Sequence, residues 1–124
     1  MKKKGFTLLE ILVVIGIIMV LVGMMTASYS TAQKKARDAK RKSDLKEIQN
    51  AMEQYYSVCS YKYPTAISGG IICLSPSTAI MPTVPVDPLT TPYVHNPNTA
   101  TNYKICTFSN LETEAAKFCV SSQQ

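Results

Sequence analysis

The sequence predicts an α+β protein in which one long N-terminal α-helix, apolar in its first half, packs by its second half on a small antiparallel β-sheet head. Three observations predict this fold. The chain of 124 residues opens with an apolar run from Phe6 to Ala27. No proline or glycine occurs between Gly23 and Pro64. Beyond Pro64 the sequence is rich in prolines, threonines, serines and short apolar runs, and the four cysteines all lie from Cys59 onward.

The apolar run is long enough to cross a membrane as one helix. At about 1.5 Å per residue, the 22 residues of Phe6–Ala27 just span a hydrocarbon core of about 30 Å. A cleaved secretory signal is the alternative, since the start is basic and Thr26-Ala27-Ser28 offers small residues. The apolar region of such a signal is shorter, about 7 to 15 residues. We therefore expect the helix to be retained.

Glu10 is the one charged side chain in this apolar run. A carboxylate in hydrocarbon is unfavourable unless it reaches the polar interface or is neutralised by a cation. Glu10 lies close enough to the start of the run to reach the interface. A cation supplied by another molecule is the other option.

One helix is expected from Phe6 to about Val58, because residues 31–56 are rich in alanine, lysine, arginine, glutamate and glutamine. Two stripes recur along it at spacings of three and four. The first holds mainly small residues: Tyr29, Ala32, Ala36, Ala39 and Ser43. The second is apolar: Leu45, Ile48, Met52 and Tyr55. Because the stripes lie on roughly opposite sides, we expect the first to pack on other helices and the second to cover the sheet.

Seven basic residues crowd the middle of this helix: Lys34, Lys35, Arg37, Lys40, Arg41, Lys42 and Lys46. With the acids among them they form a solvated face, a contact with lipid headgroups, an ion-pair surface between chains or, as the weaker option, a DNA-binding surface. Their number alone would place the C-terminal part inside the cell. The cysteines indicate the opposite side, and we follow the cysteines.

The head is expected to consist of loops and short strands. The segment Tyr103–Phe108 alternates and is rich in β-formers, so it is the best strand. Its expected partner is Tyr93–His95, across a turn at Asn96-Pro97-Asn98. The resulting antiparallel sheet would rest on the second stripe of the helix.

The cysteines are Cys59, Cys73, Cys106 and Cys119. An even count at wide spacing indicates disulfides and an oxidising compartment, and such bonds would help a core this small. The spacing favours Cys59 with Cys73 and Cys106 with Cys119, although four cysteines allow three pairings. A zinc site is disfavoured, since no Cys-x-x-Cys occurs and one histidine is present.

No motif of a catalytic site stands out. His95 would have to serve as the base, yet its neighbours indicate a turn and no glycine-rich phosphate loop or paired acid motif accompanies it. The sequence therefore predicts neither an enzyme nor a metal or cofactor site.

The stretch Lys2–Glu10, which runs straight into an apolar helix, resembles the class III signal of type IV pilins and type II secretion pseudopilins. Weaker similarities follow along the chain: Tyr55-Tyr56, Tyr63-Pro64-Thr65, Pro85-Val86-Asp87-Pro88 and Pro92-Tyr93. The resemblance implies cleavage between Gly5 and Phe6 by a prepilin peptidase on the cytoplasmic side, and N-methylation of Phe6. It also favours, for Glu10, a pairing with the amino group of a neighbouring subunit's first residue.

This family pattern divides the chain into four segments. Residues 1–5 form a leader, 6–28 a transmembrane and filament-core helix, 29–58 an amphipathic stalk, and 59–124 the disulfide-bonded β head. Where many pilins carry a helix-breaking proline, this chain has Ala27, and any melting would fall between Gly16 and Gly23. The calcium site of many major pseudopilins is not expected, because Asp87 is the one acid between Glu53 and Glu112.

The resemblance favours a structural subunit of a type IV pilus, held in the cytoplasmic membrane by a single pass and then polymerised into a surface filament for adhesion, motility or DNA uptake. The alternative is a type II secretion pseudopilin that forms a short fibre in the cell envelope for protein export. A bitopic membrane-anchored ligand-binding protein is the alternative from another class. The expected partners are further copies, minor pilins, the prepilin peptidase, the membrane assembly platform and membrane lipid, with DNA only weakly supported.

Overall fold

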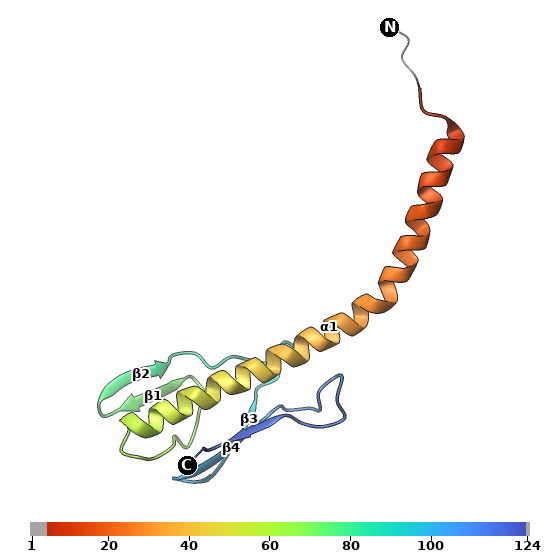
Figure 1. The fold of residues 1–124 in the computed structure, drawn as a ribbon. Coiled ribbons are helices and arrows are strands. Elements are labelled where there is room, and N and C mark those ends of the chain that lie inside the picture. The colour runs from red at the N-terminus through yellow and green to blue at the C-terminus, as the bar shows by residue number, and fades with distance from the viewer. Residues whose placement is uncertain (1–4, 124) are drawn as a thin grey trace. The chain divides into compact units, whose positions relative to one another are not determined.

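The computed structural model describes residues 5–123. The α-helix α1 runs from Leu8 to Val58, which confirms the single long helix predicted from the sequence. Gly16 and Gly23 lie within it and do not interrupt it. The chain divides into two compact units after Lys34, and α1 contributes to both (Figure 1). We call residues 35–124 the head unit.

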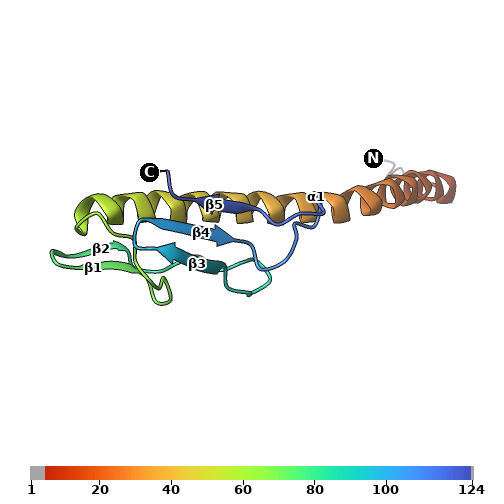
Figure 2. The ribbon, with the colours of Figure 1, turned by 90° about the horizontal axis from the view of Figure 1, so that it is seen from below.

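Five strands form two small antiparallel sheets. One is the hairpin of β1 (Ile71–Leu74) and β2 (Ser77–Met81). The other has the order β3-β4-β5, with β3 at Val94–Thr99, β4 at Asn102–Cys106 and β5 at Cys119–Ser121. Figure 2 shows β3, β4 and β5 side by side along the part of α1 that belongs to the head unit. The predicted α+β fold, a long helix on small antiparallel sheets, is confirmed.

The predicted turn at Asn96-Pro97-Asn98 is wrong. These residues lie in β3, which pairs with β4, and the chain reverses at Ala100 and Thr101. Proline is tolerated there because β3 is an edge strand, where a missing N–H need not break the ladder. The actual turn is supported by Thr99, whose hydroxyl accepts a hydrogen bond from the N–H of Thr101 at 3.3 Å.

The apolar stripe of α1 forms one side of the core. Leu45, Ile48 and Met52 are fully buried, and they pack in one cluster with Ile71, Met81, Tyr103, Ile105 and Val120. The small-residue stripe from Tyr29 to Ser43 is exposed. The two stripes therefore have the different surroundings that their positions predict, because burying apolar area against the sheet is favourable only on the second face.

Polar contacts reinforce this packing at its margins. The carboxylate of Glu53 accepts hydrogen bonds from the hydroxyls of Tyr63 at 2.8 Å and Tyr103 at 3.1 Å. Asp44 accepts one from the hydroxyl of Tyr93 at 2.9 Å. Burial, together with these acceptors, raises the pKa of each of the three tyrosines above its usual value. Buried hydroxyls thus find partners on the helix rather than in water.

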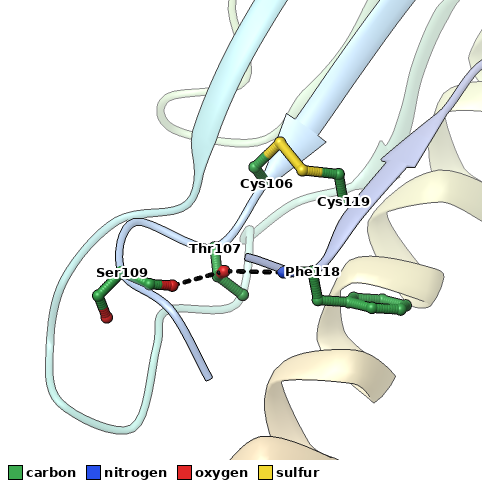
Figure 3. Close-up of a disulfide and its surroundings, with 5 residues drawn as sticks. All are labelled: Cys106, Thr107, Ser109, Phe118 and Cys119. Atoms are coloured by element: carbon green, nitrogen blue, oxygen red, sulfur yellow. Dashed lines mark hydrogen bonds between the residues drawn. A yellow bond between two sulfur atoms is a disulfide. The ribbon is translucent and has the colours of Figure 1, made fainter. Parts of the chain in front are cut away.

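Two disulfides close the head, and they join the cysteines that the spacing paired. Cys59, just after α1, is bonded to Cys73 in β1, and Cys106 in β4 is bonded to Cys119 in β5. Figure 3 shows the second bond beside the base of the loop of residues 107–118. There the hydroxyl of Thr107 donates to the carbonyl of Ser109 at 2.7 Å and accepts from the N–H of Phe118 at 3.2 Å.

The helix ends in a capping motif that places a serine where glycine is usual. The N–H of Tyr61 bonds to the carbonyl of Tyr56 at 3.1 Å, and Ser60 has φ of 59°. A side chain in this left-handed conformation costs about 1 kcal/mol or more relative to glycine.

Ser60→Gly should therefore raise the free energy of unfolding by about 0.5–1 kcal/mol, the relief of strain being partly offset by the greater freedom of glycine in the unfolded chain. Thermal or urea unfolding of the full chain in detergent measures the change. Ser57→Gly, in the last turn of the same helix, is the matched control and should lower stability. A loss at both positions would contradict the assignment of Ser60 as the cap.

Candidate functional site

The peptide bond between Gly5 and Phe6 lies before the helix, in an exposed segment. Gly5, Phe6 and Thr7 have no regular secondary structure, and the side chain of Phe6 is 80% exposed. A peptidase needs a substrate backbone that is accessible and not hydrogen-bonded in a helix or sheet. Among the described residues, the backbone at Gly5 and Phe6 meets this condition.

Thr7 is the N-cap of α1. Its hydroxyl oxygen accepts a hydrogen bond from the N–H of Glu10 at 3.2 Å, so it satisfies one of the free donors at the start of the helix. The pattern Thr-x-x-Glu is the sequence signature of such a start, and sequence reasoning did not use it. The cap places Glu10 in the first helical turn, where a negative charge interacts favourably with the helix dipole.

Glu10 is exposed and stands among exposed apolar side chains. Its carboxylate makes no hydrogen bond or ion pair with any of residues 5–123. The first half of α1 is long and apolar enough to cross a membrane, with a mean hydropathy of 2.9 over its most apolar window and none of that window buried. Within residues 5–123, Glu10 is therefore an acid without a partner on an apolar segment of the helix.

The basic residues of the stalk are not one free surface. Four of the seven make ion pairs within the head unit: Arg37 with Glu112, Lys40 with Asp44, Arg41 with three acids, and Lys42 with Glu114. Among the described residues, Lys34, Lys35 and Lys46 are exposed and have no ion pair. Within this cluster, these three lysines are the ones without an acid beside them, whereas Arg37 and Arg41 pair with acids of the head.

Arg41 is the centre of these ion pairs and is buried, with 2% of its side chain exposed. Its guanidinium donates to Asp87 through Nε at 2.5 Å and Nη2 at 3.2 Å, and through Nη1 to Asp38 at 2.8 Å and Glu112 at 3.1 Å. The acids raise the pKa of Arg41 further above its usual value. Sequence reasoning missed this role, because Asp87 and Glu112 are 46 and 71 residues away along the chain.

Besides its ion pair with Arg41, Asp38 accepts hydrogen bonds from a loop of the head. It accepts hydrogen bonds from the N–H groups of Glu112 at 3.0 Å and Thr113 at 2.8 Å, and from the hydroxyl of Thr113 at 2.7 Å. Burial by itself raises the pKa of Asp38, but these hydrogen bonds and the one from Arg41 outweigh it and lower the pKa to about 2. Asp38 thus holds the middle of the loop 107–118 on the helix.

His95 is in β3, and no acid accompanies it. It lines a cavity of about 650 Å³ between the segments 65–69 and 82–86, and no charged side chain lines that cavity. Its Nε2 is buried and has no hydrogen-bond partner in the described part of the chain, and burial lowers the pKa of His95. Among residues 5–123 no group of three or more histidine, cysteine or acidic side chains could hold a metal ion.

The paired acids give the head a defined response to pH. Burial by itself raises the pKa of Asp87, but Arg41 and the N–H of Leu89 together outweigh burial and lower it; Arg37 lowers the pKa of Glu112. Because Asp38 and these two acids have lower pKa values in the folded than in the unfolded chain, their stabilisation is complete above about pH 4–5 and is lost as the pH falls toward about 2.

We therefore expect the head to keep its fold at mildly acidic pH and to unfold below about pH 4. Tyrosine fluorescence or near-UV circular dichroism of the full chain during an acid titration measures this. Asp38→Asn should be less stable at neutral pH and its stability should depend less on pH below 4. Glu47→Gln is the control, since the carboxylate of exposed Glu47 makes no hydrogen bond or ion pair among the described residues. A steep loss of stability between pH 7 and 5 would contradict the prediction.

The comparisons with known proteins agree with this N-terminal geometry. Residues 1–26 match the prokaryotic N-terminal methylation motif. The chain is also similar to the protein named Type II secretion system core protein G of Escherichia coli (strain K12), with 40% identity over 68 residues that cover 55% of this chain and 46% of the relative. No solved structure matches the chain.

Proteins with the same name in two other organisms match as well. The one from Aeromonas hydrophila is 34% identical over 55% of this chain and 47% of its own length. The one from Dickeya chrysanthemi is 33% identical over 62% of this chain and 50% of its own length. The chain spans about half the length of these relatives. Its first 26 residues match a prokaryotic N-terminal methylation motif, and about half of the chain is similar to type II secretion core proteins G, which agrees with the resemblance to type IV pilins and pseudopilins.

Proposed function

We propose that this chain is a pilin-like subunit that polymerises through its N-terminal helix into a pseudopilus of the type II secretion kind. The relatives favour this reading over the type IV pilus subunit that the sequence alone had favoured. The match extends over only about half of each relative. A role in protein export is therefore proposed for this chain and is not taken as shown by the relatives.

The carboxylate of Glu10, which has no partner in the part of the chain that the structure describes, is the observation that carries the proposal. An exposed acid in an apolar helix is unfavourable in lipid, and pairing with an ammonium group in a helix bundle neutralises it. Cleavage after Gly5 would create that ammonium group at Phe6 of a neighbouring copy. The exposed apolar side chains of α1 from Leu8 to Met25 would then be buried against other copies.

The apolar helix and the methylation motif indicate anchoring in a membrane before assembly. The head would lie on the oxidising side, where its two disulfides are stable. A prepilin peptidase, an assembly platform and minor pilins are the partners that this function requires. The proposed role is structural, and no catalytic step is assigned to the chain.

Mass spectrometry of the N-terminus of the chain purified from cells tests the processing. The expected product begins at Phe6 and carries an N-methyl group. An intact Met1 would support the membrane-anchored ligand-binding alternative, and a start near Ser28 would show a cleaved secretory signal. Deleting the gene should reduce protein export and leave surface pili unchanged, whereas loss of surface pili would return the assignment to a type IV pilus.

Glu10→Ala should leave cleavage after Gly5 largely intact and strongly reduce the yield of sheared fibres, because the charge pair in the helix bundle is lost. Immunoblotting of processed chain and of sheared fibres measures the two effects separately. Glu47→Ala, which removes an exposed acid from the same helix, should give normal fibres. A normal fibre yield from Glu10→Ala would contradict the proposed charge pair of Glu10.

A further inference from the structure

The head has two long loops, and both are attached to α1 at one residue. Residues 82–93 connect β2 to β3 and include Asp87, and residues 107–118 connect β4 to β5 and include Glu112. The two acids meet at the guanidinium of Arg41, and Asp38 of the helix joins them there. We infer that Arg41 is an internal cation that locks both loops onto the helix together, so that loss of its charge opens both loops.

The charges around Arg41 are the first support for this lock. Three carboxylates, those of Asp38, Asp87 and Glu112, face two guanidinium groups, those of Arg37 and Arg41. Among the described cations Asp87 pairs with Arg41, and Glu112 divides its carboxylate between both arginines. Without Arg41, three acids would face one cation in a buried place, where like charges repel strongly.

The burial of the partners is the second support. Side-chain exposure is 2% for Arg41, 4% for Asp38 and 3% for Asp87, whereas Glu112 is 21% exposed. If Arg41 is lost, water can therefore solvate the buried carboxylate of Asp87 only slightly, whereas it can solvate the partly exposed carboxylate of Glu112 more. Loop 82–93 should depend on the lock most, and loop 107–118 keeps the hydrogen bonds of Asp38 and the salt bridge of Arg37.

Planar geometry is the third support. Asp87 receives two hydrogen bonds from the Nε and Nη2 side of the fork, while Nη1 serves both Asp38 and Glu112. A lysine ammonium lacks this fork and cannot reach the acids from both sides. An arginine is therefore needed to hold all three acids, a lysine would hold them only in part, and an uncharged residue of equal volume would not replace it.

Hydrogen exchange of the full chain in detergent micelles, followed by mass spectrometry, tests the lock. Arg41→Met keeps most of the stem but removes the charge, and it should speed exchange in loop 82–93 by about 100-fold and in loop 107–118 by a smaller factor. Arg41→Lys should recover part of the protection. Lys46→Met, which removes an exposed and unpaired lysine of the same helix, should change neither loop. Unchanged protection of loop 107–118 in Arg41→Met would overturn the inference.

If Arg41→Met does not fold, a double-mutant cycle gives the same answer. Asp87→Asn should open mainly loop 82–93, and Glu112→Gln mainly loop 107–118. Each single change also relieves the repulsion between the two acids, and the double variant gains this relief only once. The double variant should therefore speed hydrogen exchange by more than the product of the two single factors. Multiplicative effects would show that the loops are attached independently. The state of the N-terminus should be the same in every variant as in the unaltered chain, so this test is separate from that of the proposed function.

Discussion

One uninterrupted helix in two different surroundings is the constraint from which most of this structure follows. Its first half exposes apolar side chains on every side, and its second half buries a single apolar face against the sheets. A helix that is apolar all round requires lipid or other helices, whereas one with an apolar face requires a partner on that face. The head supplies the second partner within the chain, and the first must come from outside it.

Polar contacts supplement the small hydrophobic core of the head. Its core is small, and the helix contributes acids as well as apolar residues to the face that the head covers. Asp44 and Glu53 accept hydrogen bonds from tyrosine hydroxyls, while Asp38 and Arg41 hold the long loops. Buried charges stabilise a fold only when they are fully paired, and here the pairing joins segments that the disulfides and strands leave apart.

The N-terminal motif combines three simple devices within a few residues. An exposed peptide bond precedes the helix, a threonine caps its first turn, and an acid in that turn has no partner among the described residues. The cap makes the helix begin directly after Thr7, so the bond at Gly5 stays outside the helix while Glu10 lies in its first turn. In the proposed function, the same sequence serves first as a peptidase substrate and then as a contact between subunits.

Features that rest on neighbouring residues could be predicted from the sequence. The extent of α1, the buried stripe through Leu45 and Ile48, and the strand around Tyr103 follow from local propensity and periodicity. The isolation of Glu10 was equally visible, because a lone charge in an apolar run needs no structure to be recognised.

Features that depend on distant residues were decided by the tertiary structure. Arg41 was indistinguishable from its basic neighbours until folding brought Asp87 and Glu112 to it. The turn at Ala100 was missed because Pro97 is acceptable only on an edge strand, and edge position is a property of the sheet. The charges and turn residues of a segment show which contacts it is able to make, but long-range packing decides which residues become its partners.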